Sequence, residues 1–92
     1  MNKLGLFLKQ KRLQRRLSQR DVSDFMGYST PQFISNLERG RANLPMNQLK
    51  KFQQVLGVDS KELCEKYIEH LEEIFQKKVD FAKKRLGLKK PR

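Results

Sequence analysis

The first half of the chain contains two short apolar stripes separated by a turn. Their members lie three or four residues apart, which is the spacing that puts side chains on one face of a helix. The first stripe is Val22 and Met26, and the second is Ile34 and Leu37. We therefore predict two short helices that cross and bury these stripes against each other.

Capping residues mark both ends of the first short helix. Ser18 is a suitable N-cap, because its hydroxyl can accept a hydrogen bond from the amide of Asp21. The carboxylate of Asp21 would then lie in the first turn, against the positive end of the helix dipole. Gly27 supplies a left-handed stop at the C-terminal end.

The second short helix has its own signals. Either Ser29 or Thr30 can cap it, Pro31 suits its first position because the missing N–H costs nothing there, and Gly40 ends it. Its remaining face is polar and small, without a bulky aliphatic side chain to prevent a close approach: Pro31, Gln32, Ser35 and Asn36. Gln and Asn can each donate and accept hydrogen bonds, which suits adenine in the major groove.

Two more helices are predicted around this pair. One runs from residue 2 or 3 to Arg16 and turns Leu4 and Leu8 to the core, with Leu17 beyond its end. Its Leu6 and Leu13 form a second apolar line beside Phe7, and they are either covered by another element or single surface leucines. The other helix opens at Pro45 and ends at Gly57, with a narrow apolar stripe of Leu49, Phe52, Val55 and Leu56.

The last predicted helix is the longest. Asp59 or Ser60 caps it, and no Gly or Pro occurs from Lys61 to Leu86, so one helix of about 39 Å can form there at 1.5 Å per residue. An apolar stripe follows it: Leu63, Tyr67, Ile68, Leu71, Ile74, Phe75, Val79, Ala82 and Leu86. A domain of this size cannot cover such a stripe along its whole length.

Two partners are possible for this stripe, namely the line of Leu6 and Leu13 in the same chain or the same helix of a second subunit. We favour the dimer, with this set at its interface: Tyr67, Ile68, Leu71, Ile74, Phe75 and Val79. Lys78 interrupts the heptad-like run, so the pattern does not establish a long coiled coil.

The charge of the chain is large and unevenly distributed. The net charge of the 92 residues is +11, divided as +8 over residues 1–58, −4 over residues 59–76 and +7 over residues 77–92. The basic first segment is the expected footprint of a protein that binds a polyanion. The basic end can add nonspecific affinity for nucleic acid.

Several classes of function find no support in the sequence. No run of 18 or more apolar residues and no leader is present, so we expect a cytoplasmic protein without a membrane association. One cysteine and one histidine form neither an internal disulfide nor a usual zinc site, and there is no phosphate loop or nucleophile–base motif. We therefore expect no enzyme activity, no metal and no cofactor.

Three minor expectations concern the last helix. Cys64 is expected to be a small buried side chain, and His70 to be solvated. Five glutamates are expected to form a solvated acidic face: Glu62, Glu65, Glu69, Glu72 and Glu73.

A set of residues spread over residues 4–63 is informative through its order and its spacing. It consists of Leu4-Gly5, Leu8, Arg12, Leu17-Ser18-Gln19, Ile34-Ser35-Asn36-Leu37-Glu38-Arg39-Gly40, Asn43-Leu44-Pro45, Leu49 and Val55-Leu56-Gly57-Val58. Taken together, this set resembles the DNA-binding domain of the lambda/434 repressor and Cro type, the XRE-like helix-turn-helix family. The resemblance implies an all-α, five-helix repressor-like domain over residues 1–63. Beyond this domain, the apolar stripe and the charge pattern themselves predict an extended C-terminal helix over residues 60–86 that serves dimerisation and a basic tail over residues 87–92.

The resemblance also implies roles for individual residues. The base-reading set would be Thr30, Pro31, Gln32 and Asn36, on a recognition helix from Ser29 or Thr30 to Arg39. The resemblance further implies a DNA-backbone contact by Gln19. The residues themselves add Arg20, Ser29 and Ser35 to this backbone set, together with Arg39, Arg41 and Asn43, because the loop after Gly40 lies beside the recognition helix. Arg12 and Glu38 would form a mostly buried ion pair that holds the first helix to the recognition helix. Loss of one partner of such a pair costs roughly 3 to 5 kcal/mol.

Three features depart from the usual family pattern. The turn between Gly27 and Ile34 is one residue longer than the commonest form, which shifts the tip of the recognition helix. Ser23 replaces a usual alanine, and Phe25 and Phe33 are aromatic where polar residues are common. Phe33 can contact a thymine methyl group or cover the core, and we favour the core.

The sequence therefore predicts a sequence-specific, double-stranded-DNA-binding transcriptional regulator. We expect a homodimer that acts as a repressor rather than an activator. It would bind a palindromic operator, with its two recognition helices about 34 to 36 Å apart. The alternative is an antitoxin or adaptor-type interaction module whose C-terminal helix binds a partner protein.

Overall fold

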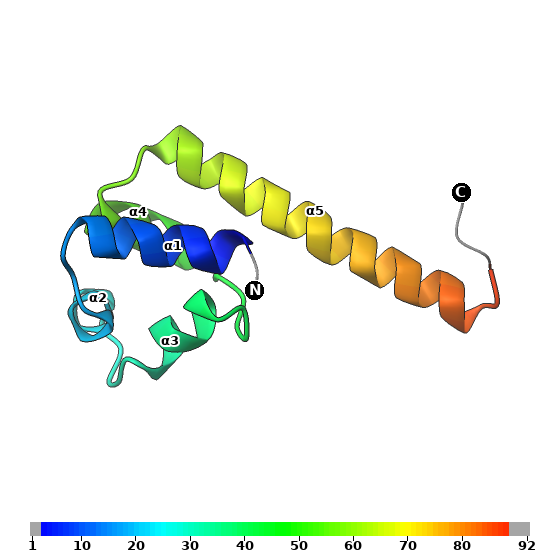
Figure 1. Ribbon diagram of the computed structural model, residues 1–92, viewed down its shortest axis with the longest axis horizontal. Helices are drawn as coiled ribbons and strands as arrows, with labels where there is room; N and C mark the ends of the chain where they lie inside the picture. The colour runs from blue at the N-terminus through cyan, green and yellow to red at the C-terminus, as the bar shows by residue number, and fades with distance from the viewer. Residues whose placement is uncertain (1–2, 89–92) are drawn as a thin grey trace.

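The computed structural model describes residues 3–88, and all regular structure in this range is helical. The elements are α1 (Lys3–Gln14), α2 (Gln19–Met26), α3 (Gln32–Glu38), a short 3-10 helix η1 (Met46–Gln48), α4 (Leu49–Leu56) and α5 (Ser60–Arg85). Figure 1 shows α1 to α4 gathered into one body, with α5 beginning beside α1 and extending far beyond it. The predicted all-α, five-helix fold is confirmed. Of the predicted basic tail, only Gly87 and Leu88 lie within the described residues.

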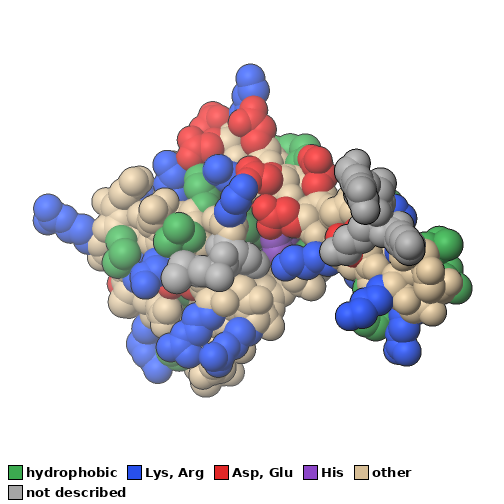
Figure 2. Space-filling view, turned by 45° about the vertical axis from the view of Figure 1, so that its right-hand side comes forward, with side chains coloured by type: hydrophobic (Ala, Val, Ile, Leu, Met, Phe, Trp, Pro, Cys, Tyr) green, Lys and Arg blue, Asp and Glu red, His purple; other side chains and the backbone are tan. Residues whose placement is uncertain are grey.

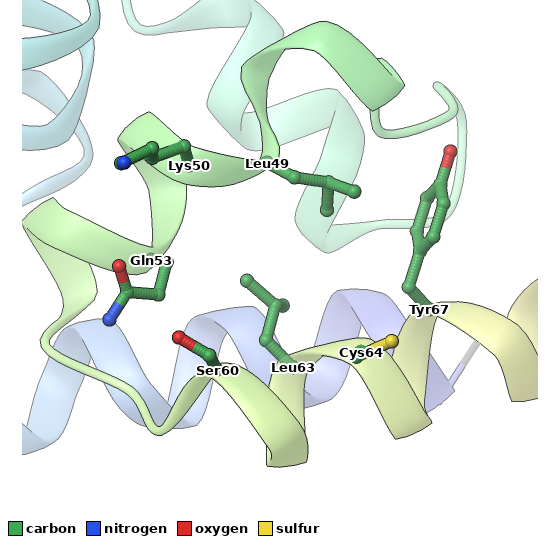
Figure 3. A pocket seen from close by; sticks show the side chains of 7 residues that line it. All are labelled: Leu49, Lys50, Gln53, Ser60, Leu63, Cys64 and Tyr67. Carbon is green, nitrogen blue, oxygen red and sulfur yellow. The ribbon is translucent and has the colours of Figure 1, made fainter.

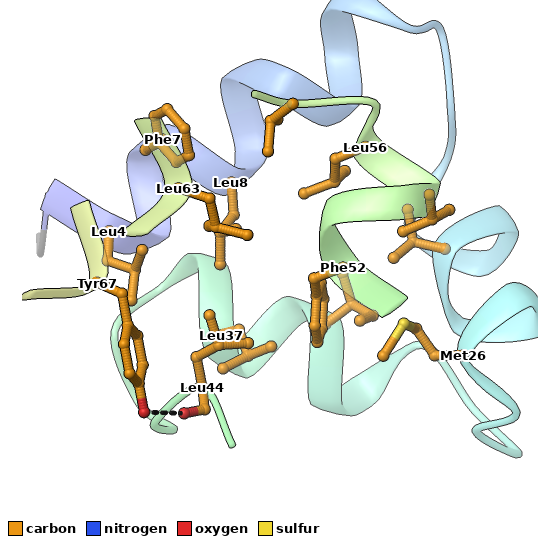
Figure 4. Packing of buried hydrophobic residues seen from close by; sticks show 14 residues of the cluster. Leu4, Phe7, Leu8, Met26, Leu37, Leu44, Phe52, Leu56, Leu63 and Tyr67 are labelled. Carbon is orange, nitrogen blue, oxygen red and sulfur yellow. Dashed lines mark hydrogen bonds between the residues drawn. The ribbon is translucent and has the colours of Figure 1, made fainter. Parts of the chain in front are cut away.

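The core joins all five α-helices. Each helix contributes apolar side chains that are almost fully buried, and Leu44 and Val58 join them from the connecting loops. The helical residues are Leu4, Phe7, Leu8, Val22, Met26, Ile34, Leu37, Phe52, Val55, Leu56, Leu63 and Tyr67. Figure 4 shows Leu4 and Phe7 of α1 beside Leu63 and Tyr67 of α5, with Phe52 and Met26 at the other end of the cluster. The stripes predicted for the two short helices and for α4 are therefore buried, apart from Leu49, which is half-buried.

Helix α1 ends earlier than predicted. It was expected to reach Arg16 but stops at Gln14, because Arg16 adopts a left-handed conformation with φ 57°. The amides of Arg16 and Leu17 then donate to the carbonyls of Leu13 and Arg12, which closes the last turn. This stop was missed because the left-handed conformation usually falls to glycine. The possible start at residue 2 lies outside the described residues.

Helix α2 has the predicted caps. The Ser18 hydroxyl accepts from the Asp21 amide at 2.9 Å, and the Asp21 carboxylate accepts from the Ser18 amide at 2.8 Å. These bonds lower the pKa of Asp21 below its ordinary value of 3.8, chiefly through the bond from the Ser18 backbone. Gly27 ends the helix with φ 81°. The direction of α2 relative to the following turn is therefore set by short-range bonds.

Two other boundaries differ from the prediction. Pro31 occupies the N-cap of α3 rather than its first helical position, so neither Ser29 nor Thr30 is the N-cap. The Thr30 hydroxyl still accepts from the Gln32 amide, at 3.4 Å. Pro45 precedes the 3-10 helix η1, and α4 begins only at Leu49. Proline fixes its own φ but does not choose between a 3-10 and an α turn after it.

The first half of α5 packs antiparallel along α1. Lys11 of α1 pairs with Glu62 at 3.0 Å, and Lys3 pairs with Glu69 at 3.2 Å near the other end of the contact. Three of the five glutamates thus belong partly to this interface, because Glu62, Glu69 and Glu73 are half-buried. Only Glu65 and Glu72 are exposed as predicted for the acidic face, part of which Figure 2 shows in red.

Three predictions for single residues of α5 are wrong. Cys64 is exposed, because it lies on the side of α5 turned away from α1. His70 is buried, with 7% of its surface exposed, because it faces the body of the domain. Tyr67 is also buried and donates from its hydroxyl to the Leu44 carbonyl at 3.3 Å, so it is a core residue and cannot serve a dimer interface. Leu6 and Leu13 remain exposed, because α5 packs on a different side of α1.

Candidate nucleic-acid interface

The recognition helix α3 is joined to α1 by a buried ion pair. Arg12 donates from Nε to Oε2 of Glu38 at 2.7 Å and from Nη2 to Oε1 at 3.0 Å. Its remaining Nη1 donates to the Leu17 carbonyl at 2.8 Å. Both side chains are below a tenth exposed, so the two charges compensate each other inside the domain. The pair has the position and the architectural arrangement that the sequence implied.

Gln19 adds α2 to this network. Its Nε2 donates to Glu38 Oε1 at 3.0 Å, so one carboxylate connects α1, α2 and α3. Gln19 is half-buried and its Oε1 has no partner among the bonds described, which leaves part of the amide for a second role. The predicted phosphate contact through this residue remains a prediction. One of the two N–H groups of its Nε2 is used inside the domain, and the other remains for that contact.

Two polar side chains lie along the exposed side of α3. Gln32 Nε2 donates to Asn36 Oδ1 at 3.1 Å, one helical turn away. Gln32 is exposed and Asn36 is half-buried. The bond holds the two amides in one orientation and leaves Gln32 Oε1 and Asn36 Nδ2 available for another molecule. Two of the four predicted base-reading residues are therefore paired with each other.

A buried hydrogen bond from α2 holds the turn that leads into α3. The Ser23 hydroxyl, which is almost fully buried, donates to the Thr30 carbonyl at 2.8 Å. The serine at this position thus bonds the longer turn to α2, which an alanine could not do. Thr30 itself stays exposed and Pro31 is half-buried.

Tyr28 and Phe33 support the same turn. Their rings meet edge to face, with centroids 5.2 Å apart, and Phe33 packs against the core as we favoured. Burial raises the pKa of the Tyr28 phenol above its ordinary value of 10.0. Phe25, in contrast, is exposed.

A groove of about 650 Å³ lies between this turn and the segment that enters α4. Thr30 and Phe33 form one wall, and Asn47 and Gln48 come from η1 on the other side. Sequence reasoning missed Asn47 and Gln48, because only the packing of η1 brings them beside the recognition helix. A polar residue after a proline carries no signal for such a position.

A second hollow, of about 300 Å³, lies at the junction of α1, α2 and α3. It is lined by Lys9, Gln19, Glu38 and Arg39. Lys9 was not among the predicted residues, since α1 was expected to act only as a support. Its position beside Arg39 adds a second cation to the edge of α3, where a phosphate would be attracted.

The other predicted backbone contacts surround α3. Arg20, Ser29, Arg39, Arg41 and Asn43 are exposed, and Ser35 is half-buried. The amides of Arg41 and Gly40 donate to the carbonyls of Asn36 and Leu37, so the loop that carries Arg41 is bonded to the end of α3. Arg41 is therefore held close to the recognition helix.

Two further findings limit the kinds of site present. Among residues 3–88, no group of three metal-binding side chains lies together. No helix in the same part of the chain is long and apolar enough to cross a membrane. The two short helices joined by a tight turn, with polar amides on the exposed side of the second, define a helix-turn-helix DNA-binding domain.

Comparisons with known proteins agree with this assignment. The model of the helix-turn-helix family matches residues 8–63, which is more than half of the chain. The chain belongs to this family, of the XRE-like type, and is a DNA-binding transcriptional regulator rather than an enzyme. A comparison with curated proteins finds no match.

Solved structures of a restriction-modification controller protein have the same fold. The wild-type restriction-modification controller protein C.Esp1396I has a TM-score of 0.61 and 24% identity, over 76% of this chain and 88% of that chain. A point mutant of the same controller protein has a TM-score of 0.61 and 26% identity, over 76% and 87% of the two chains.

Proposed function

We propose that this regulator is a homodimeric repressor that reads a palindromic operator through α3. The observation that carries the proposal is the hydrogen-bonded pair of Gln32 and Asn36 on the exposed side of α3. Because Arg12 and Glu38 join this helix to α1, the two amides are presented from a rigid element.

The chemistry of the pair favours adenine. A glutamine recognises adenine by donating to N7 and accepting from N6 in the major groove. Gln32 can do both, since its bond to Asn36 uses only one of its two N–H groups. Asn36 keeps its own donors for a neighbouring acceptor. In this proposal Thr30 and Pro31 contact the adjoining bases.

Cationic and neutral polar side chains around α3 supply the phosphate contacts in this proposal. Lys9 joins the predicted backbone set of Gln19, Arg20, Ser29, Ser35, Arg39, Arg41 and Asn43. Such contacts give affinity that does not depend on sequence and falls as salt concentration rises. The basic segment over residues 1–58, with net charge +8, fits this role.

A dimer and a palindrome follow from the small reach of α3. With seven residues, one recognition helix contacts few base pairs, and a second copy one turn of DNA away doubles the number that are read. The exposed apolar side chains of α5 offer the surface for that second copy. Repression follows if the bound dimer simply excludes other proteins from the same DNA. The cytoplasmic location expected from the sequence is part of this proposal.

Selection of bound sequences from a random DNA pool tests the proposal. We expect a palindrome with half-site centres about 10 base pairs apart, and loss of preference at one position per half-site in Gln32→Ala. Lys61→Ala is a matched control for DNA binding, because Lys61 is exposed on the side of α5 away from the body. A single asymmetric site would contradict the dimer, and an unchanged preference in Gln32→Ala would contradict the role of Gln32.

A reporter gene placed behind the selected operator tests the sign of regulation. We expect lower expression when the protein is present. An increase in expression would show activation. A partner protein that binds α5 and displaces self-association would instead favour the interaction-module alternative.

A further inference from the structure

Most apolar residues of α5 fall into two lines that face different directions, while Phe81, two turns after Ile74, continues the inward direction but is 60% exposed. The inward line consists of the buried Leu63, Tyr67 and His70 and the half-buried Ile74. The outward line begins with the exposed Cys64, Ile68, Leu71 and Phe75 and continues through Val79, Ala82 and Leu86. At about 100° per residue, the two lines lie roughly 100° apart around the helix. The outward line is therefore not covered by the body of its own chain.

The outward line repeats every eleven residues. Cys64, Phe75 and Leu86 are one set of equivalent positions, Ile68 and Val79 are a second, and Leu71 and Ala82 are a third. An eleven-residue repeat corresponds to about 3.67 residues per turn, close to the 3.6 of a straight helix. The line thus runs almost straight along α5 and suits a second straight helix.

We propose that a second copy of this chain covers the outward line, with its α5 antiparallel and a two-fold axis at Phe75. This inference rests on the proposed homodimer and specifies how its subunits meet. In this register Cys64 faces Leu86 of the second copy, Ile68 faces Ala82, Leu71 faces Val79, and Phe75 faces its own equivalent. Every apolar position of the line then has an apolar position opposite it.

Charge selects the antiparallel direction. Residues 59–76 carry −4 and residues 77–92 carry +7, so an antiparallel pair sets the acidic half of one helix against the basic half of the other. A parallel pair sets like charges against each other. Glu65 and Lys83 lie five turns apart on the same flank of the outward line, so Glu65 faces Lys83 of the second copy.

A cavity on the body lies at the end of the outward line. Its volume is about 320 Å³, and Figure 3 shows Leu49, Leu63 and Tyr67 around it, with Cys64 at its edge. In the proposed register Leu86 of the second copy arrives at Cys64. Leu86 is 76% exposed in the single chain, so its side chain is free to cover the apolar wall of this cavity.

The direction of the outward line also places the two DNA-binding bodies. Since it lies roughly at right angles to the inward line, a two-fold axis through Phe75 leaves both bodies on the same side of the helix pair. Leu63 of the second copy lies opposite Gly87, which is about 36 Å along the helix from Leu63, and the corresponding separation for Tyr67 is about 24 Å.

Disulfide formation in the full chain tests this register. Cys64 is the sole cysteine, so Leu86→Cys creates the pair that the proposal brings together. With oxidised glutathione as the oxidant, we expect at least ten times more covalent dimer on a non-reducing gel than for the wild type. In the wild type the two Cys64 thiols would be about 33 Å apart along the helices.

Two further variants act as a matched pair. In a Cys64→Ser background, Phe75→Cys should cross-link across the two-fold axis. Lys77→Cys should not, because Lys77 is exposed on the other side of α5. Circular dichroism should show unchanged helix content in each, since the substituted residues are exposed.

The possible outcomes separate this inference from the proposed function. Strong cross-linking of wild-type Cys64 with itself would show a parallel pair and overturn the register. A dimer in sedimentation that does not cross-link through Leu86→Cys would overturn the register and leave the homodimer standing. A monomer in sedimentation would overturn both, while the base preference of Gln32 would still be tested separately by DNA selection.

Discussion

The guanidinium of Arg12 and the carboxylate of Glu38 form two parallel hydrogen bonds, of 2.7 and 3.0 Å, across the contact between α1 and α3. The two residues are 26 positions apart in the chain and both are buried. Their pairing fixes the angle at which the recognition helix leaves the domain. It also holds Gln19 of α2 through the same carboxylate.

Removal of one member of this pair should be costly. Arg12→Ala should lower the free energy of unfolding by about 3 to 5 kcal/mol, because it leaves the Glu38 carboxylate buried and unpaired. Lys11→Ala removes a partly exposed pair with Glu62 and should cost at most about 1 kcal/mol. Urea unfolding of both variants checks this. Equal small losses would mean that the buried pair does not stabilise the fold.

The two classes of DNA contact should respond differently to substitution. Gln32→Ala should reduce discrimination at one operator position by about 1 to 3 kcal/mol, because a base-edge contact is lost. Arg41→Ala should weaken binding to all sequences alike and make the salt dependence shallower. Fluorescence anisotropy on operator and scrambled duplexes at several salt concentrations measures both. Equal losses of Gln32→Ala on both duplexes would exclude a base-reading role.

The cap of α2 should depend on pH. The lowered pKa of Asp21 means that its ionised form is favoured by folding. Its contribution to stability is therefore present at neutral pH and is lost as the pH falls below 3.8 and through the lowered pKa. Ser18→Ala removes the hydroxyl but keeps the backbone amide that donates to Asp21, so the Asp21 pKa should rise only part of the way toward 3.8. Loss of the cap should destabilise the protein by about 0.5 to 2 kcal/mol. Titration of the Asp21 carboxyl by NMR measures the shift, and an unchanged pKa in the variant would contradict the bonding.

The turn between α2 and α3 should require the left-handed conformation at Gly27. Gly27 has φ 81°, and an added Cβ would meet no atom within 4 Å, so the effect of a substitution is conformational alone. Gly27→Ala should cost about 1 to 2 kcal/mol, and Gly27→Asn should cost less, because asparagine tolerates this conformation. Thermal unfolding of the two variants gives the order. A more stable alanine variant would contradict it.

Substitutions in the inward line of α5 should affect monomer stability, and substitutions in the outward line should affect self-association. Tyr67→Phe removes the bond to the Leu44 carbonyl and should destabilise the monomer by about 0.5 to 1.5 kcal/mol. Phe75 is 67% exposed, so Phe75→Ala should change monomer stability by less than about 0.5 kcal/mol and weaken association. Urea unfolding at low concentration and sedimentation velocity distinguish these effects. Weakened association in Tyr67→Phe alone would reverse the assignment of the lines.

Local sequence signals were sufficient for much of the helix-turn-helix. The Ser18 cap with Asp21, the left-handed Gly27 and the buried stripes of Val22 and Leu37 depend on neighbours within a few residues. Such interactions can be recognised in a sequence because spacing alone places the partners together. The sequence did not predict the early end of α1 at Arg16 or the 3-10 turn after Pro45. Arginine does not signal a left-handed conformation, and proline does not signal a 3-10 turn.

Contacts between segments far apart in the chain could not be predicted from local sequence patterns. Buried His70, exposed Cys64 and the core role of Tyr67 all depend on which side of α5 faces α1. Periodicity shows that a helix has an apolar side, but it does not show where one side ends and a second begins when both are apolar. The position of Asn47 beside Thr30 likewise depends on the packing of η1.

The sequence by itself determined the number and order of the helices, the caps of α2, the N-cap of α5 and the family. These depend on short-range spacing and on residue types that have few alternative uses. Only the tertiary structure decided how α5 divides its apolar residues between its own domain and the solvent. That division depends on the direction of α5 along α1, which is set by contacts such as Lys11 with Glu62 and Tyr67 with Leu44, between residues far apart in the chain.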